Sequence, residues 1–142
     1  MNKSIFIDTN IFIDCILERK WKTILDRAKS VGFILNTSIT VIGEAVVKLR
    51  ESENSIENII SFMRILDDWD LRFLFPSHQI RTICYIMGNE EQDTRMINEV
   101  TDLTHLAYSM AYHIDIFITT DKNLKKYKIP DKLESIHFEK PD

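Results

Sequence analysis

The chain has 142 residues, of which 44 % are apolar and 28 % are charged, and its formal net charge is −4. This length suits one domain with its own core, so we expect a single domain over residues 1–142. The negative charge argues against binding of nucleic acid by bulk basicity and leaves a local basic patch open. Asp8 and Asp14 interrupt the apolar start of the chain, so we predict no signal peptide. No run is long enough to span a membrane, and we expect a cytoplasmic protein without membrane contact.

From the N-terminus, the apolar residues 5–7 predict a short buried strand of a parallel sheet, and Asp8 stands at its carboxyl end. Apolar residues at helical spacing then predict helix over 10–17 and 20–30, with Gly32 as the stop signal.

A second apolar run at 33–35 predicts the next parallel strand. It is followed by a helix with an apolar stripe from Ile39 to Leu49, which begins at one of three capping residues, Asn36, Thr37 or Ser38. Glu44 interrupts the apolar stretch in the second turn of that helix. Either it lies at the edge of the stripe in water, or it points into a site that contains cations, because burial of an unpaired charge is costly.

The middle of the chain continues the alternation of helices and strands. Residues 56–66 predict a helix, the alternating apolar residues at 71–75 predict a third strand, and residues 80–87 predict another helix.

The last third begins with a helical region from Met96 to Ile114, in which Thr101 is a suitable N-cap for the second part. This places Asp102 in the first turn, where an acid that compensates the helix dipole is the ordinary interpretation. Residues 116–119 predict a fourth strand, followed by Asp121 and a short helical turn, and residues 135–138 suggest an edge strand. The order β-α-β-α-α-β-α-α-β-α is typical of an α/β fold with helices on both faces of a parallel sheet.

Several classes of protein are excluded by missing motifs. The three glycines form neither a dinucleotide-binding nor a P-loop motif, and no GxSxG turn exists for a serine hydrolase. The sequence contains neither a CxxC nor an HExxH motif, so we expect no zinc site. Cys15 and Cys84 are expected to be buried free thiols in a reducing compartment.

What remains is a set of four acids at the ends of strands or in helices: Asp8, Glu44, Asp102 and Asp121. Asp8 alone is as well explained as the cap of the next helix as by a functional role. If the four converge, they repel one another and raise each other's pKa, so such a cluster is stable mainly with divalent cations. Oxygen ligands favour Mg²⁺ or Mn²⁺, which activate a water and stabilise the leaving oxygen of a phosphodiester.

Four short motifs around these acids together resemble those of a known family. Asp8-Thr9-Asn10 after a strand, Glu44 between Ser38 and Leu49, Asp102 before Leu106-Ala107, and Thr119-x-Asp121 after a strand resemble the PIN domain, and more narrowly the ribonucleases related to the VapC toxins. The resemblance runs from Ile5 to about Tyr127. It implies a three-layer α/β/α fold with a four-to-five-stranded parallel sheet, and Mg²⁺- or Mn²⁺-dependent cleavage of single-stranded or structured RNA.

The resemblance also assigns roles to residues and partners. Asp8, Glu44 and Asp102 would hold the main metal, and Asp121 would complete that site or position the water. Asn10 and Thr119 would be polar supports. Many relatives carry a further acid where this chain has Asn123, so a tightly held second metal is in doubt. For a toxin, the resemblance implies a small antitoxin whose tail covers the acidic pocket, and a homodimer.

Basic residues close to these acids in the sequence are candidates for contact with RNA phosphates. They are Lys48 after Glu44 and Lys122, Lys125 and Lys126 after Asp121, and a solvated helix face explains them equally well. His105 and His113 lie on or beside the Asp102 helix, and ordinary polar packing is favoured over a role as base or ligand.

Two alternatives remain open beside a toxin. One is an RNA-processing nuclease without an antitoxin, and the other is a non-catalytic module that keeps the fold. A phosphotransferase with an aspartyl nucleophile is disfavoured, because Asn10 stands where such enzymes carry a second acid.

Overall fold

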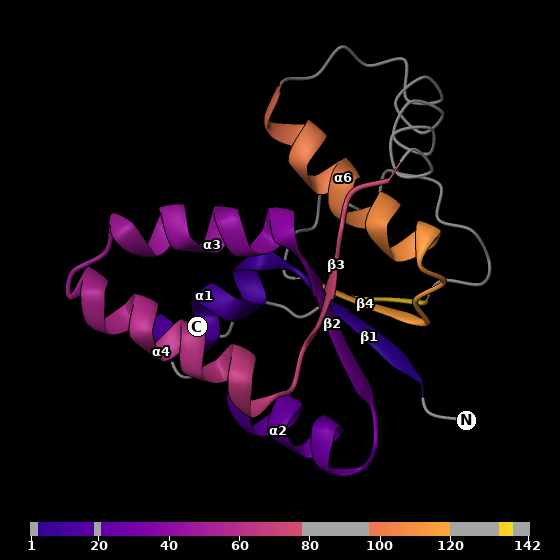
Figure 1. Cartoon of the computed structure of the whole chain (residues 1–142), viewed down its shortest axis with the longest axis horizontal. Coiled ribbons are helices and arrows are strands. Elements are labelled where there is room, and N and C mark those ends of the chain that lie inside the picture. The colour runs from indigo at the N-terminus through magenta and orange to yellow at the C-terminus, as the bar shows by residue number, and fades with distance from the viewer. Residues whose placement is uncertain (1–2, 19–20, 78–96, 120–133, 138–142) are drawn as a thin grey trace.

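The structure is a computed structural model, and it describes residues 3–18, 21–77, 97–119 and 134–137. In this part of the chain one sheet contains five parallel strands in the order β3-β2-β1-β4-β5 (Figure 1). The strands are β1 Ser4–Ile7, β2 Ile34–Ser38, β3 Arg72–Leu74, β4 Ile116–Thr119 and β5 Glu134–His137. The helices are α1 Thr9–Leu17, α2 Lys22–Ser30, α3 Ile39–Arg50, α4 Ser55–Asp68 and α6 Ile97–Ala111. The predicted helix at 80–87 and the helical turn after Asp121 lie outside the described residues.

The predicted three-layer α/β/α fold is confirmed. In Figure 1, α6 lies above the strands and α2 below them, while α3 and α4 run beside each other away from the sheet. The sheet interior consists of fully buried side chains of β1, β2 and β4, among them Phe6, Leu35 and Phe117. Phe6 stacks on Phe117, with ring centroids 5.3 Å apart. No helix among the described residues is long and apolar enough to cross a membrane.

The order of the strands in the sheet changes direction at one position. From β1 the chain moves outward to β2 and β3, and it later returns to the other side of β1 with β4 and β5. The order therefore reverses between β1 and β4. In open α/β sheets, ligands bind at the carboxyl ends of the two strands that flank such a reversal. Asp8 follows the last residue of β1, and Thr119 is the last residue of β4.

Two helix boundaries follow the predicted capping chemistry. The Ser38 hydroxyl accepts a hydrogen bond from the backbone N–H of Val41 at 3.1 Å, so Ser38 is the N-cap of α3. After α2, Gly32 has a φ of 102°, a left-handed conformation that glycine adopts without strain. Gly32 therefore ends the turn of α2, as predicted.

The second strand is longer than predicted. β2 extends through Asn36, Thr37 and Ser38, all fully buried. The Asn36 side chain donates to the carbonyl of Ile5 at 3.1 Å, and the Thr37 hydroxyl donates to that of Ile7 at 3.2 Å. The bonds of Asn36 and Thr37 to β1 replace the water that polar side chains require, so both belong to the strand, and of the three predicted capping residues only Ser38 caps α3.

The predicted role of Thr101 as an N-cap within the last long helix was wrong. α6 begins at Ile97, so Thr101 lies inside the helix and does not cap it. Asp102 is then the sixth helical residue, beyond the first turn, and compensation of the helix dipole no longer explains it. Extending an existing helix is easier than starting a new one, and a single threonine does not interrupt it.

Candidate active site

Asp8 is the buried centre of the site. Asp8 is 3 % exposed, and it is the N-cap of α1. Oδ1 accepts the backbone N–H of Thr9 at 2.8 Å, and Oδ2 accepts the hydroxyl of Thr119 at 2.6 Å. Burial raises the pKa of the Asp8 carboxyl, and His105, Thr119 and Thr9 oppose this rise. The two interpretations of Asp8 as cap and as site residue are therefore compatible, because each carboxylate oxygen has a separate partner.

Glu44 approaches the same place from α3. Its side chain is 26 % exposed, with Oε2 3.3 Å from Nε2 of His105 and Oε1 3.3 Å from Nζ of Lys48. Burial raises the pKa of the Glu44 carboxyl, but the hydrogen bonds and charges of His105 and Lys48 prevail and hold it below its ordinary value. Glu44 is therefore neither a free surface acid nor an unpaired buried one.

His105 lies between the two acids. It is fully buried on α6, and its Nε2 lies 3.7 Å from Oδ1 of Asp8 and 3.3 Å from Oε2 of Glu44. The Thr9 hydroxyl is 3.5 Å from the same nitrogen. Two carboxylates thus converge on one nitrogen atom. The sequence favoured ordinary polar packing for His105, and the i+3 spacing from Asp102 was the one signal that connected it to the acids.

Lys48 forms the exposed edge of the site. Its ammonium donates to Oδ1 of Asn10 at 3.1 Å and pairs with Glu44. This contact links α1 to α3 and gives Asn10 a supporting position beside the acids. Lys48 is thus near the acids in space as well as in sequence, and its side chain is still 44 % exposed.

The other predicted site residues lie partly or wholly outside the described residues. Asp102 has a described backbone position on α6, one turn before His105. The remaining predicted residues are Asp121, Lys122, Asn123, Lys125 and Lys126, all in the undescribed range 120–133. Where these side chains lie stays a prediction.

The donor set fits a hard divalent cation. Asp8 and Glu44 offer carboxylate oxygens, the ligands that Mg²⁺ and Mn²⁺ prefer. A cation between them would also neutralise the buried charge of Asp8. Among the residues whose side chains are described, no group of three or more His, Cys, Asp or Glu forms a complete metal cluster. Two acids with one histidine are the part of the site that the described chain supplies.

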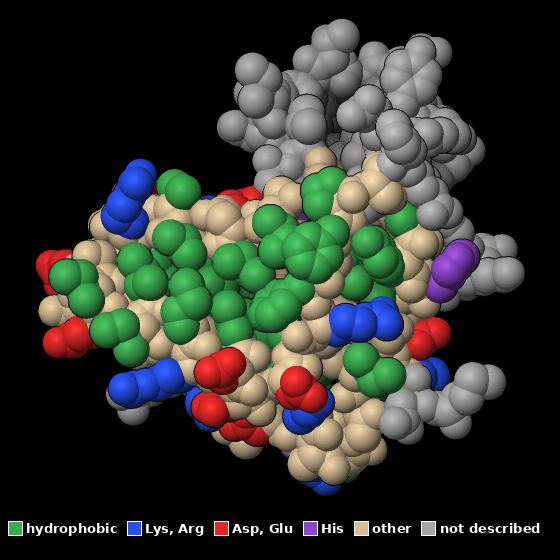
Figure 2. All heavy atoms as spheres, in the orientation of Figure 1, with side chains coloured by type: hydrophobic (Ala, Val, Ile, Leu, Met, Phe, Trp, Pro, Cys, Tyr) green, Lys and Arg blue, Asp and Glu red, His purple; other side chains and the backbone are tan. Residues whose placement is uncertain are grey.

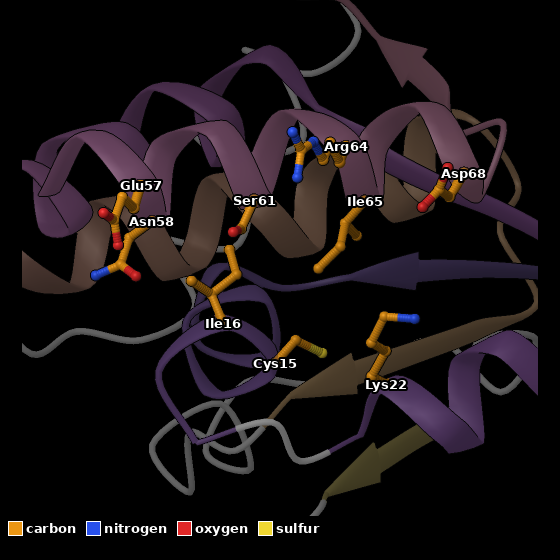
Figure 3. Close-up of a pocket in the computed structure, with 9 residues that line it drawn as sticks. All are labelled: Cys15, Ile16, Lys22, Glu57, Asn58, Ser61, Arg64, Ile65 and Asp68. Atoms are coloured by element: carbon orange, nitrogen blue, oxygen red, sulfur yellow. The ribbon is translucent and has the colours of Figure 1, made fainter. Parts of the chain in front are cut away.

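A separate pocket of about 430 Å³ lies between α1, α4 and the start of α2 (Figure 3). Cys15, Lys22, Arg64 and Asp68 are among its lining residues, and neither Asp8 nor Glu44 lines it. Burial raises the pKa of the Cys15 thiol to about 12. The thiol is thus protonated at neutral pH and is no nucleophile. We therefore place the candidate reaction centre at the carboxyl ends of β1 and β4.

Comparison with known proteins relates the fold to solved structures. No protein-family model matches the chain, and a search of curated proteins finds no significant match. Among solved structures, VapBC2 from Rickettsia felis, bound to a DNA fragment from its promoter, matches with a TM-score of 0.77 at 18 % identity, over 94 % of this chain and 98 % of that one.

Two further structures agree with this result. DNA-bound VapBC from Salmonella typhimurium matches with a TM-score of 0.74 at 16 % identity, over 96 % of this chain and 98 % of that one. VapC20 from Mycobacterium tuberculosis, a toxin that cleaves the sarcin-ricin loop, matches with a TM-score of 0.62 at 14 % identity, over 87 % of this chain and 96 % of that one. The chain therefore has the PIN-domain fold of the VapC toxins.

Proposed function

We propose that this chain is a metal-dependent endoribonuclease and the toxin of a toxin–antitoxin pair. The observation that carries the proposal is the convergence of Asp8 and Glu44 on His105 at the strand ends where the sheet order reverses. The fold shared with VapC20, a toxin that cleaves the sarcin-ricin loop, supports the same class of reaction. Asp102 and Asp121 are proposed to complete the ligand set, as the resemblance implies.

The residues of the site have separable tasks in this proposal. Asp8 and Glu44 bind the cation, and Thr9 and Thr119 orient the Asp8 carboxylate through its two oxygens. Bound Mg²⁺ or Mn²⁺ supplies Lewis acidity toward water and the phosphodiester. Lys48, together with Lys122, Lys125 and Lys126, is proposed to attract RNA phosphates toward an otherwise negative pocket, which would make binding salt-sensitive.

The test is incubation of the protein with tRNA, rRNA fragments and single-stranded RNA in Mg²⁺, Mn²⁺ or EDTA. Asp8→Asn runs beside the native chain in every reaction. Discrete cuts that require metal and disappear in the variant are the expected result. If the chain neither cuts RNA nor binds Mn²⁺, the non-catalytic module replaces the nuclease.

An apolar surface supports the partner half of the proposal. We call this surface the apolar face and define it by the exposed side chains Ile39 and Val47 of α3, Ile56, Ile60 and Met63 of α4, and Phe73 and Phe75 at β3. Figure 2 shows hydrophobic side chains gathered over these elements. Contiguous apolar surface of this kind marks interaction sites on small proteins. The VapBC complexes indicate the occupant, a small antitoxin.

The pairing is tested by coexpression of the chain with a candidate small antitoxin. A stable complex that blocks cleavage is expected, and Ile60→Asp should weaken the complex while leaving cleavage intact. Ile24→Asp is the matched control, because Ile24 is 51 % exposed, close to the 46 % of Ile60, but lies on α2. Cleavage that no such antitoxin inhibits would favour the RNA-processing nuclease instead.

A further inference from the structure

His105 makes one-sided contacts for a buried histidine. Every polar neighbour of its ring among the described residues lies at Nε2: Glu44 at 3.3 Å, Thr9 at 3.5 Å and Asp8 at 3.7 Å. Nδ1 is buried without a hydrogen-bond partner in the same part of the chain. Buried polar atoms are usually paired, so a ring placed for polar packing alone would be expected to use both nitrogens. The imidazole ring is therefore oriented so that Nε2 meets the two acids, while Nδ1 has no hydrogen-bond partner among the described residues.

The neighbours determine which nitrogen carries the proton. Two carboxylates face Nε2, and carboxylates accept hydrogen bonds, so an N–H at Nε2, which the imidazolium and one neutral tautomer both carry, matches its surroundings. A proton at Nδ1 would leave a buried donor without an acceptor among the described residues. His105 therefore donates toward the acids, and its nearest acceptor is Oε2 of Glu44.

The ring has rigid support behind it. Its centroid lies 6.3 Å from that of Phe6, which in turn stacks on Phe117 of the neighbouring strand. The ring is thereby held against the sheet core that also positions Asp8. Glu44, by contrast, lies on α3 and reaches the site through a long, partly exposed side chain. The imidazole on α6 thus connects the buried sheet core at Phe6 to the partly exposed carboxylate of Glu44.

We propose that His105 is a positioning residue, whose Nε2–H holds the Glu44 carboxylate beside Asp8 so that both acids meet one divalent cation. This inference rests on the proposed metal site and adds a residue that the four acids do not include. Groups that orient metal-binding side chains typically contribute about 10- to 100-fold to metal affinity. The cation would otherwise have to order Glu44 at the moment of binding.

The experiment measures Mn²⁺ affinity of the purified chain by electron paramagnetic resonance, independently of RNA cleavage. His105→Gln keeps an amide N–H near the position of Nε2, whereas His105→Asn is equally polar but too short to reach Glu44. We expect the dissociation constant for Mn²⁺ to rise about tenfold or more in His105→Asn and to stay within about threefold of the native value in His105→Gln.

Two controls separate positioning from a general loss of stability. Ser109→Ala removes a buried hydroxyl that donates to the His105 carbonyl at 3.3 Å, one turn along α6, without a contact to the acids. It is expected to lower the melting temperature and leave Mn²⁺ affinity unchanged. Cleavage by His105→Asn should also recover at high Mn²⁺, because the lost affinity is then compensated.

The outcomes distinguish this inference from the proposed function. Equal Mn²⁺ affinity in His105→Asn and the native chain overturns the positioning role and leaves the metal site standing. Equal weakening in His105→Gln and His105→Asn also overturns it, since the donor at the Nε2 position would then be irrelevant. A native chain that binds no Mn²⁺ overturns the metal site and the inference together.

Discussion

Replacement of Asp8 by asparagine should make the protein more stable while abolishing its activity. Asp8 is almost completely buried, and burial raises the pKa of its carboxyl above the ordinary value. The folded chain therefore holds this proton more tightly than the unfolded chain does, and ionisation at neutral pH destabilises the fold. Asparagine removes the charge and keeps a side-chain oxygen for the N–H of Thr9. Its amide N–H takes the place of Oδ2, where the Thr119 hydroxyl can accept a hydrogen bond instead of donating one.

The raised pKa of Asp8 has a direct cost in folding free energy. Each unit by which the folded pKa exceeds the unfolded one costs about 1.4 kcal/mol of stability at neutral pH. Asparagine caps a helix about as well as aspartate, so the cap itself changes by a few tenths of a kcal/mol at most. We expect Asp8→Asn to be more stable than the native chain at pH 7 without metal, and each kcal/mol gained should raise the melting temperature by about 3–4 °C for a chain of this size.

The stability advantage of Asp8→Asn should depend on pH. The native carboxyl is neutral below its ordinary pKa, so the native chain and Asp8→Asn should then have similar stability. As the pH rises through the raised folded pKa, the native chain loses stability and the advantage of the variant appears. Asp8→Ala is the control, because it removes the charge together with the cap and should lose about 1 kcal/mol relative to Asp8→Asn.

The assay is thermal and urea unfolding of the three proteins in EDTA from about pH 3 to about pH 8, a range that begins below the ordinary aspartate pKa. RNA cleavage in Mn²⁺ is measured in parallel, and Asp8→Asn should lose at least about a hundredfold, since several kcal/mol of charge stabilisation depend on the cation. A variant less stable than the native chain at pH 7, or a difference that does not vary with pH, would refute the reasoning about burial.

The remaining predictions concern other parts of the same site. Thr119→Val removes the hydroxyl donor to Asp8 and should cost about 1–3 kcal/mol in urea unfolding, and a cost near zero would show that this bond does not stabilise the buried acid. Ser38→Ala removes the N-cap of α3 and should cost about 1 kcal/mol, whereas Ser30→Ala, on the exposed end of α2, should change stability little. Mn²⁺ at about 100 times its dissociation constant should stabilise the native chain by about 2.7 kcal/mol in a thermal scan, and equal stabilisation of Asp8→Asn would contradict the site.

The parts of the fold that the sequence predicted are those in which local pattern and tertiary environment agree. β1 and β4 are short runs of apolar residues buried on both faces, and the structure confirms both. β2 was predicted too short, because Asn36 and Thr37 owe their place in the sheet to carbonyls of β1, some 30 residues earlier. Only the strand pairing reveals those acceptors.

The residues of the candidate site were likewise predicted only in part. Asp8 and Glu44 were selected from their positions relative to a strand and a helix, and the structure brings both to His105. The importance of His105 was missed, because its contact with Glu44 joins residues 61 positions apart and depends on where the fold places α6 and α3. An apolar helical stripe with one histidine is compatible with simple packing, so the pattern alone did not distinguish the two.

The most direct test of the central claim is a Mn²⁺ titration of the native chain and three single variants, Asp8→Asn, Glu44→Gln and Glu57→Gln. Glu57 is an exposed acid on α4 that lines the separate pocket, so Glu57→Gln removes the same charge away from the site. If Asp8 and Glu44 hold one cation, each of the first two variants raises the Mn²⁺ dissociation constant at least about tenfold, and Glu57→Gln leaves it unchanged. Equal affinity in all four proteins would contradict a shared cation site at Asp8 and Glu44.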